Sequence, residues 1–399
     1  MSQRLVSLNA DLSRLRADGY DVAIGTSKHL LVRNVPYVNS AKQVERGTIV
    51  SDLDLAGETT VQPKSHVVFF VGDYPCNEQG AVLPGVSQNT NQALGEGLTP
   101  NHQISRKPTT GPTAGKYQDY YEKLTTYIAI VSGPAQAIDP MAAAITNPVV
   151  VPDEDESVFN YVDTAATKAG IVVANSKLEG RTVAIIGAGG TGSYVLDLVA
   201  KTPVAEIHLF DDDVFLNHNA FRCPGAASLD DLAKKQKKVD YLAANYSRMH
   251  KHVIGHDCFV DEDTVEQLEG IDFAFLCIDK GTGKRLIVER LEEWGLPFID
   301  VGMGIQLGDD NKLGGIVTVT TSIPSKRDHL PNRVAFADGE GADEYSRNVQ
   351  IAEINALNAA LAVIKWKKLC GYYDDATSEH WCAYTIRSNQ LISEDLHEA

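Results

Sequence analysis

The chain has 399 residues, of which 43% are hydrophobic and 22% charged, and its formal net charge is −17. This length favours two or three domains, and the composition is that of an ordinary globular protein. The negative charge argues against non-specific binding to nucleic acid or to an anionic membrane surface. The sequence has neither an apolar run long enough to span a membrane nor the apolar core of a signal peptide, so we expect a cytoplasmic protein.

The cysteines do not form a recognisable framework. They are Cys76, Cys223, Cys258, Cys277, Cys370 and Cys382. No two of them form a C-x-x-C pair, so we predict no structural zinc site of the kind that two such pairs build. A disulfide framework is not expected in a chain of this size and class.

Residues 1–135 are predicted to form a smaller α+β domain. Leucines at helical spacing predict a helix over residues 3–18, and the pattern of residues 116–131 predicts a closing helix. Residues 76–115 are rich in Gly, Pro, Asn and Thr and are predicted to be mostly loop. Strands are predicted over Asp21–Ile24, His29–Val32, Thr48–Val50 and His66–Val71.

A sheet that ends in the turn Gly72–Pro75 (GDYP) and is followed by a long loop is loosely similar to ubiquitin-conjugating-enzyme folds. A catalytic domain of that kind would need a cysteine in or after the loop. Only Cys76 is available, and it comes earlier than the catalytic position of that family. We therefore expect an accessory domain that uses no cysteine and holds a partner protein. His66 and His102, with Ser105 close by, are the alternative basis for a separate activity there.

A linker is predicted over residues 136–156, which contain several prolines and end in the acidic run Asp153–Glu156. Residues 157–399 then form the second domain, which is predicted to begin with a helix over Ser157–Ile171. Later strands are predicted over Phe273–Ile278, Pro297–Val301, Gly314–Thr321 and Trp381–Ile386, and helices over Lys284–Trp294 and Val349–Leu369.

Residues 181–222 carry the strongest pattern in the chain. The apolar run Val183–Ile186 predicts a buried strand, Tyr194–Ala200 predicts a helix, and a second predicted strand, Ile207–Phe210, ends in Asp211. The turn after the first strand contains Gly187, Gly189, Gly190 and Gly192. Glycines let backbone N–H groups approach a phosphate, and a strand-terminal acid can accept hydrogen bonds from ribose hydroxyls. We therefore predict a Rossmann-like α/β nucleotide-binding fold.

The residues beyond the turn bear on which nucleotide binds. Gly187, Gly189 and Gly192 satisfy G-x-G-x-x-G, a pattern that alone favours NAD. Further polar residues follow in the sequence, and the last of them ends a third apolar strand. These polar residues are Asp213, Asn219, Arg222, Lys238 and Asp279.

Together these elements resemble the ThiF/MoeB/ubiquitin-activating-enzyme superfamily. The pattern of that family is a GxGGxGS loop, a D-x-D, an N-x-x-R, a downstream lysine and a strand-terminal aspartate. The chain matches it with GAGGTGS at residues 187–193 and with the polar residues named above, over roughly residues 160–320. A lysine-rich helix is predicted next, with Lys234, Lys235, Lys237 and Lys238. Lys235 and Lys237 compete with Lys238, which best keeps the family's distance to the end of its helix.

The resemblance implies ATP-dependent adenylation of the C-terminal carboxylate of a small ubiquitin-like or sulfur-carrier protein, with release of pyrophosphate. It implies that Arg222 and Lys238 contact the phosphates and that Asp279 binds Mg²⁺. It also implies that Asp211 anchors the ribose and that Asp213 and Asn219 line the same pocket. A homodimer is expected, and the first domain would hold the ubiquitin-like protein or a conjugating-enzyme-like partner.

The ubiquitin-activating branch of that family also uses a cysteine that takes the activated protein as a thioester. No cysteine lies between Asp279 and Leu369, and neither Cys223 nor Cys370 lies at the expected position. We therefore expect the activity to stop at adenylation. The helix predicted over Val349–Leu369 is apolar nearly all round, so we expect it to be buried or at a dimer interface.

Two other functions stay open. An NAD(P)-dependent oxidoreductase would use the same glycine turn, but no proton-relay residues accompany it, and Arg222 and Asp279 would have no role. A scaffold that binds a ubiquitin-like protein without catalysis is the other alternative, although the complete set of polar residues argues against it.

Overall fold

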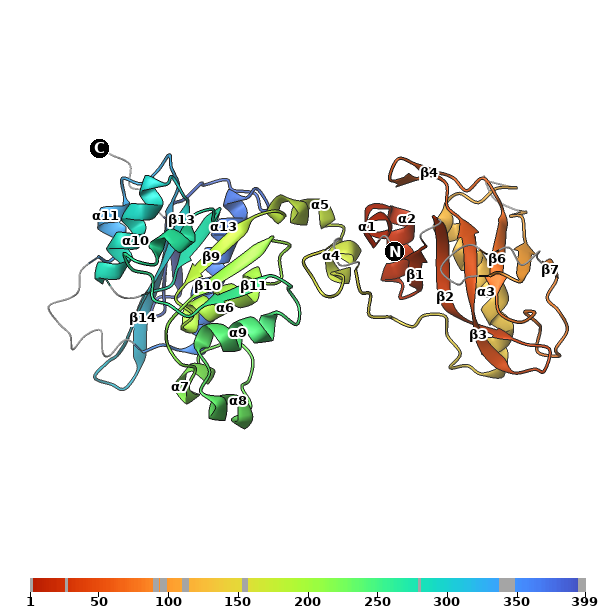
Figure 1. The fold of residues 1–399 in the computed structure, drawn as a ribbon, viewed down its shortest axis with the longest axis horizontal. Coiled ribbons are helices and arrows are strands. Elements are labelled where there is room, and N and C mark those ends of the chain that lie inside the picture. Colours follow the sequence, from red (N-terminus) through yellow and green to blue (C-terminus); the bar gives the residue numbers. More distant parts are fainter. Residues whose placement is uncertain are drawn as a thin grey trace. The chain divides into compact units, whose positions relative to one another are not determined.

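The computed structural model describes residues 3–25, 28–88, 93, 99–109, 115–152, 157–278, 281–336 and 349–393. The chain divides into two compact units, Met1–Val173 and Ala174–Ala399, which we call the amino-terminal and the carboxy-terminal unit. Each unit has its own hydrophobic core, and each contains a sheet covered by helices (Figure 1). Across the described residues, no helix has both the length and the apolar character that crossing a bilayer would require.

An antiparallel sheet forms the centre of the amino-terminal unit. Its strands, in spatial order, are β1 (Asp21–Ile24), β2 (His29–Val38), β3 (Val44–Asp52), β6 (Val67–Val71), β8 (His102–Ser105) and β7 (Val86–Gln88). The short strands β4 (Leu55–Ala56) and β5 (Thr59–Thr60) form a separate hairpin. The helices are α1 (Gln3–Leu8), α2 (Ala10–Ala17), α3 (Tyr120–Ile138), α4 (Thr164–Ala169) and α5 (Val172–Asn175), the last of which spans the junction between the units.

Helix α3 packs against the sheet and forms much of this core. Leu124 and Tyr127 from α3 are fully buried with Phe70 from the sheet. The Asp119 side chain begins the helix by accepting a hydrogen bond from the Glu122 backbone N–H. The unit is therefore an α+β structure, as predicted.

The helix predicted over residues 3–18 is in fact two helices that meet at Asn9. The Asn9 amide donates to the backbone carbonyl of Glu58 and accepts from the N–H of Thr60, so it binds the β4–β5 hairpin. A side chain used in this way competes with continuous helical hydrogen bonding. The pattern of leucines could not reveal this break, because the hairpin lies about fifty residues further along the chain.

The amino-terminal unit extends to Val173, beyond the expected domain end at residue 135. Part of the expected linker packs on this unit: the backbone N–H groups of Thr146 and Asn147 both donate to the carbonyl of Gly19, and Ala144 is buried in its core. The helix predicted over Ser157–Ile171 is shorter than expected. It forms only α4, which ends where Gly170 adopts a φ of 69°.

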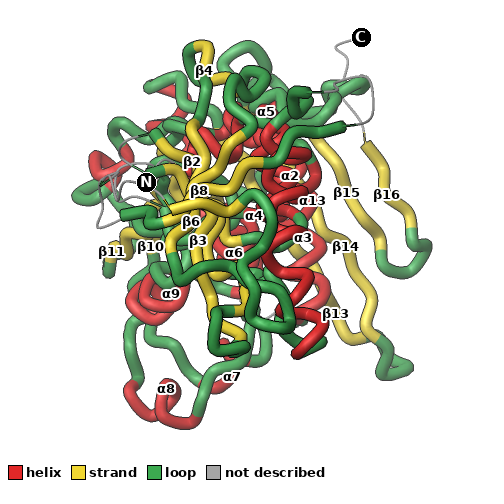
Figure 2. The backbone as a smooth tube through the Cα atoms, turned by 90° about the vertical axis from the view of Figure 1, so that its right-hand side faces the viewer, coloured by secondary structure: helices red, strands yellow, loops and turns green. Residues whose placement is uncertain are grey.

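A mixed sheet forms the centre of the carboxy-terminal unit. Its strands, in spatial order, are β11 (Val253–His256), β10 (Glu206–Phe210), β9 (Thr182–Ile186), β12 (Phe273–Leu276), β13 (Phe298–Leu307), β14 (Leu313–Ser322), β15 (Trp381–Thr385) and β16 (Gln390–Ser393). The strands from β11 to β13 are parallel, and those from β13 to β16 are antiparallel. Strands β14, β15 and β16 can be followed side by side in Figure 2.

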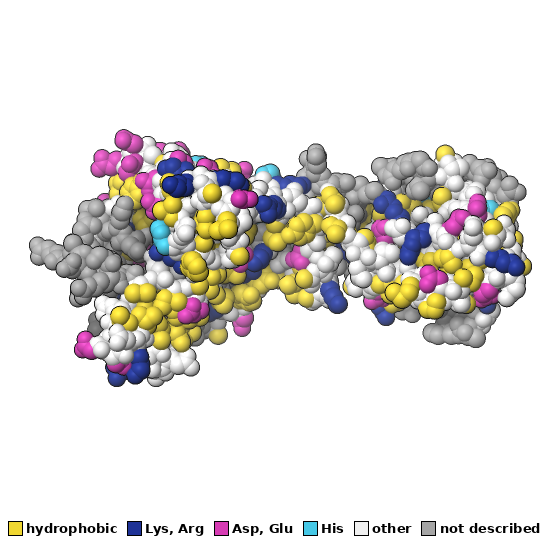
Figure 3. Space-filling model, turned by 90° about the horizontal axis from the view of Figure 1, so that it is seen from below, with side chains coloured by type: hydrophobic (Ala, Val, Ile, Leu, Met, Phe, Trp, Pro, Cys, Tyr) yellow, Lys and Arg dark blue, Asp and Glu magenta, His cyan; other side chains and the backbone are white. Residues whose placement is uncertain are grey.

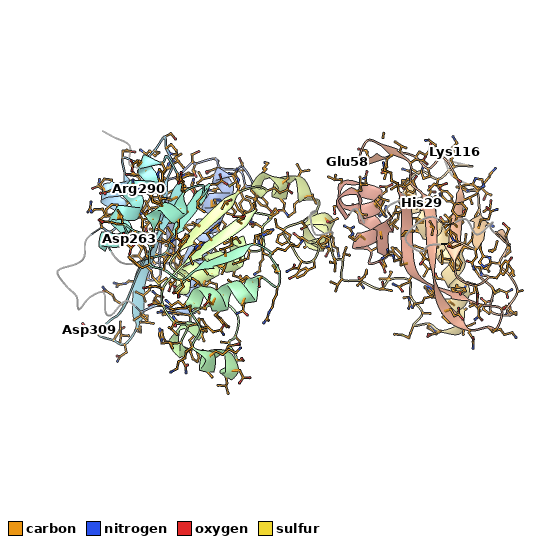
Figure 4. The ribbon with its side chains drawn as sticks, viewed as in Figure 1. His29, Glu58, Lys116, Asp263, Arg290 and Asp309 are labelled. Carbon is orange, nitrogen blue, oxygen red and sulfur yellow. The ribbon has the colours of Figure 1, made fainter. Side chains whose placement is uncertain are left out.

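Helices cover both faces of this sheet. The helices are α6 (Gly190–Val199), α7 (Asn217–Ala220), α8 (Leu229–Lys234), α9 (Lys238–Tyr246), α10 (Gly281–Glu293), α11 (Leu330–Arg333) and α13 (Ala352–Leu369). Helices α6 and α13 pack together over one face, where Trp366 is fully buried. Helix α10, on which Arg290 is labelled in Figure 4, contributes Ile287 to the core of the other face. This two-faced parallel arrangement confirms the predicted Rossmann-like fold.

The register of the parallel strands brings their carboxyl ends to one edge. Ile186 at the end of β9 pairs with Phe210 on β10 and with Leu276 on β12. Ligands of open α/β sheets bind outside this edge. The glycine turn and the acid of β10 therefore meet there, although more than twenty residues separate them in the chain.

The surface carries charges of both signs. Lys and Arg side chains are interspersed with Asp and Glu over the face seen in Figure 3, and apolar side chains lie between them. Among the most exposed apolar residues are Phe221 and Leu229, each 86% exposed. Both belong to the segment that follows β10, close in sequence to the polar residues expected at the site.

Candidate functional site

The turn after β9 requires glycine at several positions. Gly187 has a φ of 95°, and a Cβ there would lie 2.5 Å from the carbonyl oxygen of Cys277. At Gly192 a Cβ would lie 1.8 Å from the carbonyl oxygen of Gly187. Because glycine permits these close approaches, the chain can turn directly from β9 into α6, which begins at Gly190. The first N–H groups of a helix have no partner within the helix, so the amino-terminal end of α6 is suited to binding a phosphate.

Asp211 ties the end of β10 to this turn. One of its carboxylate oxygens accepts a hydrogen bond of 2.8 Å from the N–H of Ala188, and the other accepts one of 2.9 Å from the N–H of Asp213. The ammonium of Lys238 lies 3.2 Å from the same carboxylate, whose side chain is only 10% exposed. Asp211 therefore holds the glycine turn, the following loop and a lysine together.

Within the described residues, Lys238 is the only lysine of residues 234–238 that contacts the predicted site residues. It is 5% exposed, its ammonium lies 2.6 Å from the Asp213 carboxylate, and its N–H donates to the Asp213 carbonyl. Lys237 pairs instead with Asp257, and Lys234 with Asp231. The prediction of one lysine-rich helix was wrong: Lys235 adopts a φ of 49° and ends α8, and α9 begins at Lys238.

Asn219 and Arg222 place unpaired donors in buried positions. Asn219 is 1% exposed, and its side-chain oxygen accepts a hydrogen bond from the N–H of Leu216. Within the described part of the chain, neither Asn219 Nδ2 nor Arg222 Nε has a hydrogen-bond partner, although both are buried. A buried donor without a partner costs about 1–3 kcal/mol. These two donors are therefore suited to the oxygens of a ligand.

Asp279, the expected Mg²⁺ ligand, lies outside the described residues. In the parts of the chain that are described, Asp211, Asp212 and Asp213 form a group whose ligand atoms lie within 4.8 Å of one another. The ammonium of Lys238 already contacts two of these carboxylates, so the group alone is poorly suited to a divalent cation. Magnesium stays a prediction that rests on Asp279.

The three cysteines considered as nucleophiles do not favour a thiolate. Cys76 is fully buried and its thiol donates to the carbonyl of Tyr74, while burial raises its pKa. Burial also raises the pKa of Cys223 and of Cys370. Thiolates that attack acyl groups occupy exposed, electropositive positions.

A buried ion pair near the same sheet edge escaped the sequence-based reasoning. Lys284 on α10 lies 2.7 Å from Asp300 on β13, and each side chain is 5% exposed. Asp300 pairs in register with Leu276, close to the end of β12. The one available signal was an aspartate inside an apolar strand (FIDV), which is unusual unless a cation accompanies it.

Comparison with known families bears on the carboxy-terminal unit directly. Residues 165–326 match the ThiF family, and residues 10–164 match a domain of unknown function, DUF6791. Residues 165–326 are a ThiF family domain. This confirms the resemblance found in the sequence and the prediction of an enzyme of this family. The ThiF match supports adenylation of a carboxylate in general, and DUF6791 is an extra domain.

Solved structures with a similar fold include PaaA and MccB. PaaA is 19% identical with a TM-score of 0.46, over 57% of this chain and 67% of that chain. Escherichia coli MccB with ATP is 19% identical with a TM-score of 0.46, over 59% of this chain and 70% of that chain. MccB in complex with N-formylated MccA is 19% identical with a TM-score of 0.45, over 59% of this chain and 71% of that chain. These values are too low to transfer a substrate. No functionally curated protein matches the sequence.

Proposed function

We propose that this protein uses ATP to adenylate the C-terminal carboxylate of a small ubiquitin-like or sulfur-carrier protein. The observation that carries the proposal is the pair of buried donors Asn219 Nδ2 and Arg222 Nε, in the segment that follows the glycine turn and β10. Neither has a hydrogen-bond partner among the residues that the structure describes. A helix start, a cation and unpaired donors together suit a polyphosphate. Residues 165–326, as a ThiF family domain, support the same chemistry.

The reaction is a nucleotidyl transfer. A carboxylate oxygen of the substrate protein attacks the α-phosphorus of ATP, the bond from that phosphorus to the β-phosphate oxygen breaks, and pyrophosphate leaves with the electron pair. The turn and the start of α6 bind phosphate oxygens, and Arg222 and Asn219 donate to the oxygens on which charge develops. Mg²⁺, held by Asp279, would neutralise phosphate charge when bound.

Lys238 needs a change of partner to reach the phosphates. Its ammonium lies between Asp211, whose side chain is 10% exposed, and Asp213, whose side chain is 70% exposed. A phosphate arriving at the exposed side would compete with Asp213, because that carboxylate loses little by returning to water. Asp211 keeps its backbone hydrogen bonds and remains the anchor beside the ribose.

The oxidoreductase alternative is less well supported. Asp211 does not separate the two functions, because ATP and a dinucleotide both present ribose hydroxyls to a strand-terminal acid. The match of residues 165–326 to the ThiF family favours adenylation instead. The sequence also offers no proton-relay residues beside the pocket for a hydride-transfer reaction.

The remaining assignments follow from the family resemblance. We propose a cytoplasmic homodimer whose product, an acyl-adenylate, is passed to a separate nucleophile, since burial raises the pKa of Cys76, Cys223 and Cys370 and so disfavours a thiolate at each. The amino-terminal unit is proposed to be a non-catalytic domain that holds the ubiquitin-like protein or a conjugating-enzyme-like partner.

The test compares nucleotides and then the reaction. Thermal denaturation with ATP·Mg²⁺, NAD⁺ or NADPH should show stabilisation by ATP·Mg²⁺ alone, since a ligand of the folded state raises its stability. Arg222→Ala should reduce this shift, whereas Arg248→Ala, at an exposed position, should leave it intact. Pyrophosphate exchange with candidate ubiquitin-like proteins follows. Stabilisation by a dinucleotide alone would refute the proposal.

A further inference from the structure

Helix α13 carries a buried asparagine that faces the start of α6. Asn355 is fully buried, and its side chain lies so close to Gly190 that a Cβ on that glycine would be 2.1 Å from Asn355 Nδ2. Asparagine is a poor residue for a helix interior, and a buried amide needs hydrogen-bond partners. The partners of this amide therefore indicate why it is there.

The Asn355 amide joins two parts of the candidate site. Its oxygen accepts a hydrogen bond of 3.1 Å from the hydroxyl of Thr191, in the first turn of α6. Its nitrogen donates to the backbone carbonyl of Arg222 over 3.4 Å, at the long end of the hydrogen-bond range. One side chain thus connects the phosphate-binding turn to the main chain of the residue proposed to contact the phosphates.

Within the described residues, no other hydrogen bond ties Arg222 to the glycine turn. Its own N–H donates to the carbonyl of Asn219, within the same segment. A cation must be held within about 0.5 Å of its productive position to stabilise developing charge, and that requires support from rigid elements. Helix α13, packed on the sheet through Trp366, is such an element.

We propose that Asn355 is a positioning residue that fixes Arg222 relative to the phosphate-binding turn. The role of Asn355 in catalysis rests on the proposed function, but the physical link between α13 and residues 216–223 can be tested independently of that function. Asn355 is not proposed to touch ATP or the reacting atoms. It acts through the carbonyl of Arg222.

The same helix supplies a matched control. Asn358 is also fully buried, one helical turn further along, and its amide nitrogen donates to the carbonyl of Gly302 over 3.0 Å. Asn358→Ala removes a buried amide from α13 but leaves the Arg222 carbonyl untouched. It therefore reports the general destabilisation that such a loss produces.

The experiment uses the full chain and measures hydrogen–deuterium exchange and ATP affinity. Asn355→Ala removes the donor to the Arg222 carbonyl and the acceptor for Thr191 without adding a charge beside the phosphate-binding turn. It should speed amide exchange in residues 216–223 and weaken ATP·Mg²⁺ binding about fivefold to tenfold, the effect of one hydrogen bond. Asn358→Ala should do neither, even if it lowers the denaturation temperature more.

A double-mutant cycle separates positioning from stability. If Asn355 acts through Arg222, Asn355→Ala should weaken ATP binding in the wild-type background and have little further effect in an Arg222→Ala background. Additive effects would overturn the inference, as would unchanged exchange in residues 216–223. If the wild-type protein binds no ATP, the proposed function fails, and the exchange comparison of the Asn355 and Asn358 variants alone decides the inference.

Discussion

Lys123 is a lysine inside the core of the amino-terminal unit. It is 1% exposed, its ammonium donates to the hydroxyl of Ser51 over 2.8 Å, and burial lowers its pKa to about 8. In the unfolded chain the same lysine has a pKa near 10.5. A site of this kind favours the neutral amine, because an ammonium without a carboxylate contact is poorly stabilised there.

This pKa difference predicts a pH dependence of stability. Between about pH 8 and 10.5 the unfolded chain still binds a proton that the folded chain has lost, so the free energy of unfolding should rise with pH, by roughly 3 kcal/mol in all. Lys123→Met should remove this rise and be at least as stable as wild type near pH 7. Urea denaturation followed by circular dichroism from pH 7 to 10.5 checks it. A Lys123→Met variant that keeps the full rise would contradict the assignment.

At the scale of the element, two glycines of the glycine turn differ in how much space a side chain would have. A Cβ on Gly192 would lie 1.8 Å from the carbonyl oxygen of Gly187, whereas a Cβ on Gly189 would have nothing within 4 Å. Gly192→Ala should therefore destabilise the carboxy-terminal unit by about 1–3 kcal/mol, since the backbone must shift. Gly189→Ala should change stability by much less. Urea denaturation followed by tryptophan fluorescence measures both, and equal losses would show that the turn does not constrain Gly192.

The Lys284–Asp300 pair joins α10 to β13 and gives a second prediction at this scale. Removing one member of a buried pair leaves an uncompensated charge, so Lys284→Met should cost about 3–5 kcal/mol. The double variant Lys284→Met/Asp300→Leu should recover most of that loss, because no charge is left behind. The same fluorescence measurement tests it. A double variant no more stable than the single one would mean that packing, and not the stranded charge, dominates the loss.

At the scale of the whole molecule, the two units have separate cores. Leu124 lies in the core of the amino-terminal unit and Leu242 in that of the carboxy-terminal unit. All three tryptophans, Trp294, Trp366 and Trp381, belong to the carboxy-terminal unit. Tryptophan fluorescence therefore follows the unfolding of one unit, and circular dichroism follows both.

We expect the two units to unfold independently. Leu242→Ala should lower the stability seen by tryptophan fluorescence by about 2–5 kcal/mol, the usual loss for a buried leucine. Leu124→Ala should leave that fluorescence transition unchanged and shift only a second transition seen by circular dichroism. If Leu124→Ala shifts the fluorescence transition as much as Leu242→Ala does, the units unfold as one cooperative body.

Regular elements could be predicted where their signals were local. The strand, glycine turn, helix and strand of residues 182–210 agree with the expected pattern, because each feature depends on neighbours within a few residues. In place of the helix expected over residues 3–18 there are two helices that meet at Asn9. Of the helix expected over Ser157–Ile171, only α4 forms. In the first case a distant hairpin provides the competing hydrogen bonds, so no local pattern could have revealed it.

The sequence by itself determined the nucleotide-binding fold, its ThiF resemblance and the identity of most polar residues at the sheet edge. These follow from contiguous motifs whose geometry is dictated by glycine, strand and helix preferences. The family's spacing already favoured Lys238 over Lys237, but only the tertiary structure showed that the ammonium of Lys238 contacts Asp211 and Asp213, since neighbouring residues at the start of a helix point in different directions. It alone revealed Asn355, which meets Arg222 across 133 residues of sequence, since a contact of that range is created by packing and not by local pattern.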